Sequence, residues 1–167
     1  MTRFTFFLPS FCLLIVPAIA VAEVQIPIEC RIANSPAGRC GWCALETLAR
    51  RHGIKALYGV ADRYSSRVRP HDLESAVAAA HVNYRIQERG CRGTDILRNA
   101  IAKDLGAVVG FRPPYSGAGE HIVTLVDFGP EEVRILDPND KDGQVRTMDL
   151  DSFLEEWDGF ALVLDRP

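Results

Sequence analysis

Four residues of types that serve covalent catalysis occur in order along the 167-residue chain: Asn34, Cys40, His121 and Asp137. A thiol becomes a nucleophile when an imidazole takes its proton, and a carboxylate beside that imidazole fixes its tautomer and stabilises its charged form. The sequence therefore indicates a Cys–His–Asp triad that forms an acyl-enzyme, which water then releases. The amide of Asn34, six residues before Cys40, is a candidate oxyanion donor together with the Cys40 backbone N–H. Arg39 is an alternative donor.

Cys40 stands where a helix is expected to begin. A segment containing Pro36 and Gly38 precedes it, and apolar residues then recur at helical spacing as far as His52. Gly53 suits the left-handed end of such a helix. Unpaired backbone N–H groups and the positive end of the dipole at a helix start favour a thiolate. We therefore predict a helix from about Cys40 to His52, with the nucleophile in or just before its first turn.

His121 and Asp137 are expected on neighbouring strands of one hairpin. His121 opens an apolar segment eight residues before Gly129, and Asp137 closes the next apolar segment eight residues after it. A turn near Gly129 would make the two residues near cross-strand neighbours at the open end of the hairpin. The triad forms if the start of the Cys40 helix packs against that end of the sheet.

The remaining periodicity predicts an α+β fold in which N-terminal helices pack on an antiparallel sheet. Further helices are expected over 70–80, 94–105 and 149–157. Strands are expected over 82–86, 107–111, 121–128, 133–136, 144–148 and 160–164. Helices come first and strands follow as a meander, so the pattern does not alternate as in parallel α/β folds.

Residues 1–22 have the pattern of a bacterial-type signal peptide. Arg3 is their only charged residue, an apolar stretch follows, and Ala20-Val21-Ala22 fits a cleavage site, so we expect cleavage after Ala22 and a periplasmic or secreted location. The remaining 23–167 is long enough for a single domain. The net charge of −3 and the absence of basic runs argue against a nucleic-acid partner. After the signal peptide, no segment is long and apolar enough to span a membrane.

Four cysteines remain after the expected cleavage, and export permits disulfides. Three complete pairings exist, but a working Cys40 must stay free, and we predict that Cys30 pairs with Cys91 because both lie in polar, loop-like sequence. Cys43 is then expected to be a small core residue. No metal or other cofactor is predicted, because the cysteines offer only one close pair. The histidines outside the triad are predicted to be surface or cap residues: His52, His71 and His81.

Together these motifs resemble the bacteriocin-processing double-glycine peptidases, family thirty-nine of the cysteine peptidases, which have a papain-like fold. The likeness rests on Cys40-Gly41-Trp42-Cys43, His121-Ile122-Val123 and Leu136-Asp137-Pro138, with Asn34 where the family has Gln. His52-Gly53 and the closing Phe153, Trp157-Asp158-Gly159 and Phe160 also match. The resemblance implies Cys40 as nucleophile, His121 as base, Asp137 as its orienting partner, and a peptide or protein substrate. Family members are usually fused to export transporters, so a functional link to one is implied, whereas we expect this chain to be free-standing and exported.

Other functions remain open from the residues alone. Cys43 could be the nucleophile instead, although Ala37, six residues before it, offers no oxyanion donor. Cys40 and Cys43 form a Cys-x-x-Cys pair at a helix start, as in thiol-disulfide proteins. A transglutaminase-like acyl transferase would use the same chemistry, and a non-catalytic peptide-binding module could keep the fold without it. The sequence favours Cys40 and hydrolysis, and it leaves the substrate sequence open.

Overall fold

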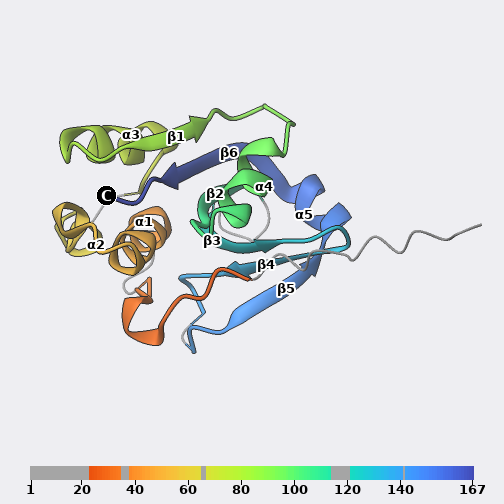
Figure 1. Ribbon diagram of the computed structural model, residues 1–167, viewed down its shortest axis with the longest axis horizontal. Helices are drawn as coiled ribbons and strands as arrows, with labels where there is room; N and C mark the ends of the chain where they lie inside the picture. Colours follow the sequence, from red (N-terminus) through yellow and green to blue (C-terminus); the bar gives the residue numbers. More distant parts are fainter. Residues whose placement is uncertain (1–22, 35–37, 65–66, 114–120, 141) are drawn as a thin grey trace, which may run out of the picture.

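The computed structural model describes residues 23–34, 38–64, 67–113, 121–140 and 142–167 (Figure 1). The predicted signal peptide over 1–22 lies outside the described residues. Within them, no helix is both long enough and apolar enough to cross a membrane.

A six-stranded antiparallel sheet lies at the centre of the fold, in the order β1-β6-β2-β3-β4-β5. Its strands are β1 (Tyr84–Gln87), β2 (Ala107–Phe111), β3 (His121–Phe128), β4 (Glu132–Leu136), β5 (Val145–Asp149) and β6 (Trp157–Leu164). The strands β2 to β5 form the expected meander. The last strand returns across the sheet to lie between β1 and β2, a long-range pairing that the sequence pattern did not predict. It also begins at Trp157, three residues earlier than predicted.

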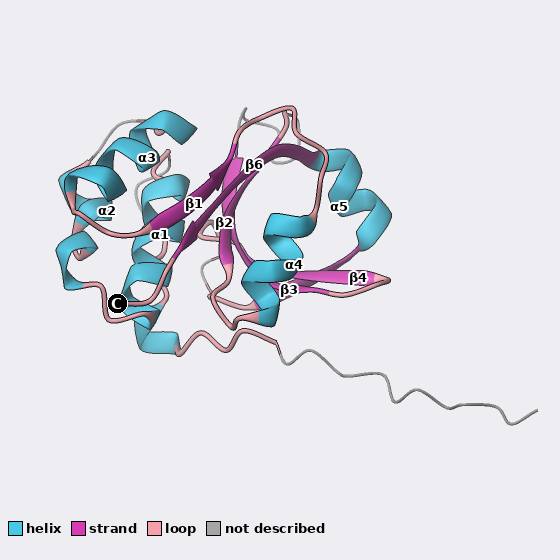
Figure 2. Cartoon of the chain, turned by 45° about the horizontal axis from the view of Figure 1, so that its top comes forward, coloured by secondary structure: helices cyan, strands magenta, loops and turns pink. Residues whose placement is uncertain are grey.

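Helices cover both faces of this sheet. The helices are α1 (Cys40–Arg51), α2 (Val60–Arg63), α3 (Pro70–Ala79), α4 (Asp95–Ala102) and α5 (Leu150–Glu156), with short 3-10 turns η1 (Ile28–Cys30) and η2 (Lys55–Leu57). Figure 2 shows α1, α2 and α3 on one side of the sheet and α4 and α5 on the other. The predicted α+β class and antiparallel sheet are therefore confirmed, with helices on both faces.

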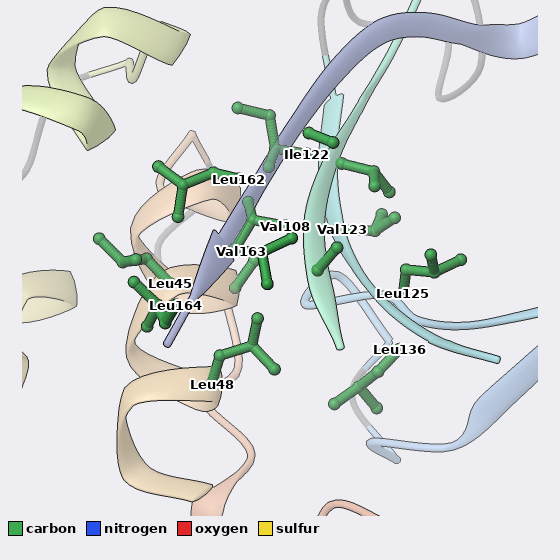
Figure 3. Packing of buried hydrophobic residues seen from close by; sticks show 14 of the residues in the cluster. Leu45, Leu48, Val108, Ile122, Val123, Leu125, Leu136, Leu162, Val163 and Leu164 are labelled. Atoms are coloured by element: carbon green, nitrogen blue, oxygen red, sulfur yellow. The ribbon is translucent and has the colours of Figure 1, made fainter. Parts of the chain in front are cut away.

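The helix α1 is held by its apolar side. Trp42, Leu45 and Leu48 recur at spacings of three, and each is at most 4% exposed. Figure 3 shows Leu45 and Leu48 projecting from α1 toward sheet residues such as Leu164. Full burial of a leucine side chain contributes about 2 kcal/mol, so Leu45 and Leu48 fix the helix against the sheet.

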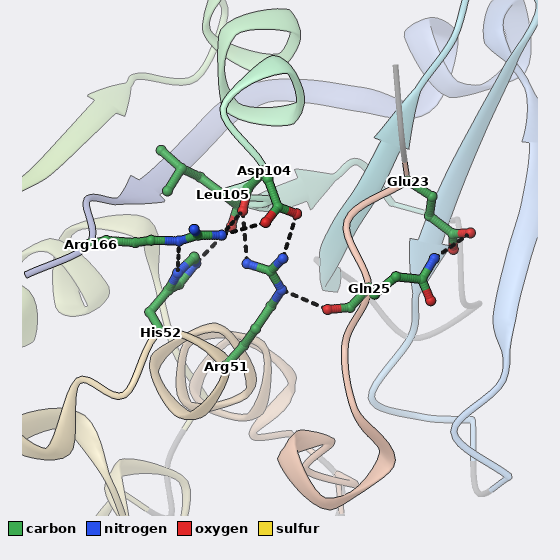
Figure 4. Close-up of polar contacts among 7 residues, drawn as sticks. All are labelled: Glu23, Gln25, Arg51, His52, Asp104, Leu105 and Arg166. Carbon is green, nitrogen blue, oxygen red and sulfur yellow. Dashed lines mark hydrogen bonds and ion pairs between the residues drawn. The ribbon is translucent and has the colours of Figure 1, made fainter. Parts of the chain in front are cut away.

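The other end of α1 is held by polar contacts (Figure 4). His52 Nε2 lies 2.8 Å from the Leu105 carbonyl oxygen, and Arg51 donates to the backbone oxygen of Asp104 at 2.8 Å. Arg166, near the C-terminus, donates to the same Asp104 oxygen at 2.7 Å. His52 is the C-cap of α1, one of the two roles predicted for it, although it is only 9% exposed. The His52 ring also accepts a hydrogen bond at Nδ1 from Arg166 Nε at 3.4 Å.

Candidate active site

The fold brings the start of α1 to the start of β3, and with it Cys40 to His121. Both side chains are nearly enclosed: Cys40 is 8% exposed and His121 is 2% exposed. A hydrogen bond joins the thiol to the imidazole. On its other side, His121 Nε2 lies 2.8 Å from Asp137 Oδ1. Because Nε2 is used by Asp137, the remaining ring nitrogen, Nδ1, is the one available to Cys40.

Asp137 reaches His121 through the pairing of β3 with β4. Thr124 pairs with Leu136, the last residue of β4, so Asp137 follows at the position opposite Val123. Val123 and His121 are two residues apart on β3 and therefore point to the same face of the sheet. Asp137 is the diagonal neighbour of His121 rather than its direct partner, a separation that long side chains bridge.

A glycine allows α1 to approach β3 this closely. A Cβ placed on Gly41 would overlap Val68 Cγ1 and lie 3.0 Å from Ile122 Cδ1. Gly41 follows Cys40 directly, so any side chain there would push the first turn of α1 away from the strand that carries His121. The backbone groups of Gly41 and Ile122 also hydrogen-bond to the Cys40 sulfur.

The electrostatics of the site favour a charged pair. Burial alone would raise the pKa of Cys40, but the hydrogen bond and charge of His121, together with the two backbone bonds, lower that pKa overall. Burial alone would lower the pKa of His121, whereas its bonds to Asp137 and Cys40 raise it to about 9. Burial likewise opposes ionisation of Asp137, but His121 outweighs it and the pKa of Asp137 is lowered. A thiolate, an imidazolium and a carboxylate therefore stabilise one another in sequence.

Asn34 lies beside this site, in the segment that leads into α1. Its Oδ1 accepts the Arg39 backbone N–H at 2.9 Å, and its Nδ2 donates to Asn139 Oδ1 at 2.6 Å. Because the first bond requires an oxygen, it settles which way the amide points. One Nδ2 hydrogen is committed to Asn139 and the second is left for another acceptor. The Arg39 guanidinium turns toward α2 instead, donating to the Ala61 carbonyl at 2.6 Å.

The other cysteines have no part in this arrangement. Cys43 is fully buried, and burial raises the pKa of its thiol to about 12, as befits the predicted core residue. The predicted bridge between Cys30 and Cys91 does not form, since all four cysteines in the described part of the chain are free. Cys30 lies near the arginines at the end of α1, whereas Cys91 packs its backbone against Gly159 on β6. The polar, loop-like sequence around Cys30 and Cys91 does not indicate that the two residues lie in different parts of the fold.

One hollow is lined by a residue of the candidate triad, and a second lies beside Trp42. A pocket of about 160 Å³ lies beside Asp137, between the N-terminal segment and the end of the β3–β4 hairpin, with Ile32, Thr47 and Thr124 in its wall. A wider, more open hollow of about 580 Å³ lies beside the first turn of α1, where Trp42 stacks on Tyr64 with ring centroids 4.4 Å apart. Within the described residues, no group of acidic, histidine and cysteine side chains could hold a metal ion.

Among the solved structures that share this fold are two peptidases of transporters. One is a double glycine motif protease from an AMS/PCAT transporter in complex with the leader peptide, with a TM-score of 0.61 and 14% identity, covering 87% of this chain and 94% of that one. The other is the peptidase domain of Streptococcus ComA, a bifunctional ABC transporter involved in quorum sensing, with a TM-score of 0.62 and 18% identity, covering 81% and 97%. Neither models of protein families nor curated proteins give a match.

These similarities confirm the fold that the sequence motifs implied. The chain has the architecture of these two peptidases over most of the length of each. At identities of 14% and 18%, the likeness is one of fold, so the chemistry rests on the residues of this chain.

Proposed function

We propose that the protein is a cysteine peptidase that hydrolyses a peptide bond through Cys40, His121 and Asp137. The observation that carries this proposal is the continuous contact from the Cys40 thiol through the imidazole to Asp137 Oδ1, whose last link is 2.8 Å long. Three residues from α1, β3 and the end of β4 meet there in the order that acyl transfer requires. The fold shared with peptidase domains is consistent with this chemistry.

In the first half of the reaction, the Cys40 thiolate attacks the carbonyl carbon of the scissile bond. The oxygen becomes negative, and we assign its stabilisation to the Cys40 backbone N–H and the second hydrogen of the Asn34 amide. His121, as an imidazolium, gives its proton to the departing amine, and the C–N bond breaks. A thioester remains on Cys40.

In the second half, His121 is neutral and takes a proton from water as the water oxygen attacks the thioester carbonyl. The C–S bond breaks, the acid product leaves, and the proton restores the thiolate–imidazolium pair. Asp137 keeps Nε2 hydrogen-bonded throughout, so Nδ1 faces the sulfur in both steps.

We infer that the substrate is a peptide or an unfolded protein segment. One structural neighbour is described in complex with a leader peptide, which makes leaders with a double-glycine motif the first class to test. The open hollow at Trp42 and Tyr64 is the proposed binding surface, because it borders the first turn of α1 and presents a stacked aromatic pair. From the sequence of residues 1–22, we further propose that the chain acts after export, in the periplasm or outside the cell.

Thiol–disulfide exchange is a weaker candidate on physical grounds. A resolving cysteine must ionise and be reached, yet Cys43 is 0% exposed and its pKa is raised to about 12. Cys40 and Cys43 have the spacing of a Cys-x-x-Cys motif, but the thiol of Cys43 is poorly suited to attack a mixed disulfide.

The test is a digest of a peptide library by the full chain, read by mass spectrometry, with double-glycine leader peptides included as one set. We expect cleavage by the natural protein and by Cys43→Ala, and none by Cys40→Ala. A peptide aldehyde should form an adduct on Cys40 alone. No cleavage of any peptide by a folded protein whose Cys40 is rapidly alkylated would leave the peptidase proposal without support, and the binding module would then be favoured.

A further inference from the structure

We propose that Asn139 is a positioning residue of this site, which holds the oxyanion donor and the triad carboxylate in register through two separate hydrogen bonds. Its backbone N–H donates to Asp137 Oδ1 at 2.8 Å, and its side-chain Oδ1 accepts from Asn34 Nδ2 at 2.6 Å. This inference rests on the proposed function, because it assigns a role within the same reaction.

The first bond acts on the carboxylate. Asp137 Oδ1 receives both His121 Nε2 and the Asn139 backbone N–H, so its lone pairs on that oxygen are aimed by two donors. The Asn139 bond also contributes to the lowered pKa of Asp137. Because a backbone N–H makes this contact, it persists whatever side chain stands at position 139.

The second bond acts on the loop before the nucleophile. Asn34 Nδ2 is held by Asn139, while Asn34 Oδ1 holds the Arg39 backbone N–H, one residue before Cys40. The Asn34 backbone N–H also donates to the Pro138 carbonyl at 2.7 Å. Two bonds therefore cross between the segment that leads into α1 and the segment that follows β4, and we call this pair of segments, residues 34 and 138–139, the clamp.

The hydrogen bonds of the clamp connect the segment before Cys40 to the Asp137 carboxylate. From Cys40 the path runs through the backbone to Arg39, across to Asn34, across to Asn139, across to Asp137 and back through His121. Asn34 Nδ2 is held by its covalent bond to Cγ and by its hydrogen bond to Asn139. The direction of its second N–H is therefore determined, as is required of a donor to a developing negative charge. This matters more for asparagine than for glutamine, whose longer side chain can reach further on its own.

Asn139 is exposed, so water competes for its side-chain bond and its effect on folding should be small. Its effect on the reaction should be larger, because a small misplacement of a reacting group is costly. A positioning role and a merely structural one therefore predict different results.

The test compares Asn139→Ala, which removes the acceptor, with Asn139→Asp, which keeps an acceptor oxygen. For Asn139→Ala we expect kcat to fall about ten-fold or more with little change in KM, and a melting temperature close to that of the natural protein. The pH profile of Cys40 alkylation by iodoacetamide should stay unchanged, because the backbone bond to Asp137 remains. Asn139→Asp should recover most of kcat.

A second measurement does not need peptidase activity. Amide exchange of the Arg39 N–H, followed by NMR, should be about five-fold faster in Asn139→Ala, because Asn34 is released, and near normal in Asn139→Asp. The clamp is overturned if the Arg39 N–H of Asn139→Ala exchanges at the rate seen in the natural protein, whether or not kcat changes. It is also overturned if kcat of that variant equals kcat of the natural protein. If no peptide is cleaved even by the natural protein, the proposed function fails, while the exchange result still decides the clamp. Asn139→Leu, which keeps the volume without an acceptor, replaces the alanine variant if that one does not fold.

Discussion

Asp137 Oδ1 lies 2.8 Å from His121 Nε2 although the two residues are not paired across the hairpin. Near the turn, Phe128 pairs with Val133. A bulge between Leu125 and Asp127 then shifts the register of all the pairs beyond it by one residue. Without that bulge, Asp137 would stand opposite Thr124, whose side chain points to the other face of the sheet from His121. The bulge therefore decides that carboxylate and imidazole share a face.

Asp137→Asn should lower kcat/KM by about two to four orders of magnitude, because the amide no longer stabilises the imidazolium and can present the wrong hydrogen-bonding atom to Nε2. Peptide hydrolysis at neutral pH measures it. Asp151→Asn is the matched control, since Asp151 is an exposed carboxylate in the first turn of α5. Equal activity of the two variants would remove Asp137 from the triad.

Activity should follow a bell-shaped pH profile. Hydrolysis requires the thiolate, whose pKa is lowered by His121 despite burial, so the acid limb should lie below the ordinary thiol range. It also requires the imidazolium, whose pKa is raised to about 9, so the basic limb should lie near pH 9. Alkylation of Cys40 needs only the thiolate and should not fall on the basic side. An alkylation profile that rises only at the pH of an ordinary thiol would contradict the charged pair.

Stability should fall at high pH through the same histidine. The pKa of His121 rises from 6.5 to about 9 on folding, so its contribution is complete below about 6.5 and is lost as the pH rises through about 9. Urea unfolding of the natural protein and of His121→Ala, at pH 6 and pH 10, measures the loss. The free energies of unfolding should differ more between the two proteins at pH 6 than at pH 10, and the reverse order would contradict the assignment.

Substitutions at the two cysteines of α1 should have different effects on hydrolysis. Cys40→Ala should remove hydrolysis, by about four orders of magnitude or more, whereas Cys43→Ala should keep activity and lose some stability, because it leaves a small void in the core. A thiol reagent at neutral pH should label Cys40 far faster than Cys43, whose pKa of about 12 keeps it protonated. Loss of hydrolysis in Cys43→Ala but not in Cys40→Ala would reverse the assignment of the nucleophile.

Gly41→Ala should damage the site from within the helix. The new methyl group would overlap Val68 and press on Ile122, so the first turn of α1 must move away from β3. We expect a loss of about 1–3 kcal/mol in the free energy of unfolding and a fall of about 10- to 100-fold in kcat/KM. Because alanine favours a helix more than glycine does, helix propensity alone would stabilise this variant, so a loss of stability reports the overlap with Val68 and Ile122. Full activity in Gly41→Ala would show that the close approach is dispensable.

Several parts of the fold were predictable because their causes are local. The apolar spacing of Trp42, Leu45 and Leu48 and the left-handed Gly53, with φ 71°, suffice to define α1. The strand limits of β2 and β3 follow from continuous apolar segments ended by polar or glycine-rich sequence. The place of β6 between β1 and β2 could not be predicted, because it joins residues about eighty positions apart and no local pattern encodes that choice.

The candidate site divides in the same way. Asn139 was missed by sequence reasoning, because an asparagine after Asp137-Pro138 is typical of an ordinary turn. The expected Cys30–Cys91 bridge was wrong for a related reason, since loop-like sequence does not reveal which loops meet.

By itself, the sequence determined which groups could react: a thiol at a helix start, an imidazole at a strand start and a carboxylate at a strand end, because residue type and local periodicity fix those features. The tertiary structure decided whether they meet, through the register shift in the β3–β4 hairpin and the approach of α1 allowed by Gly41. It also decided which of the two thiols in α1 has a lowered pKa, since only packing makes Cys40 the neighbour of His121 and leaves Cys43 in the core. Hydrogen bonds and charge interactions between these groups act over a few ångströms. Residues remote in sequence come that close only once the chain has folded.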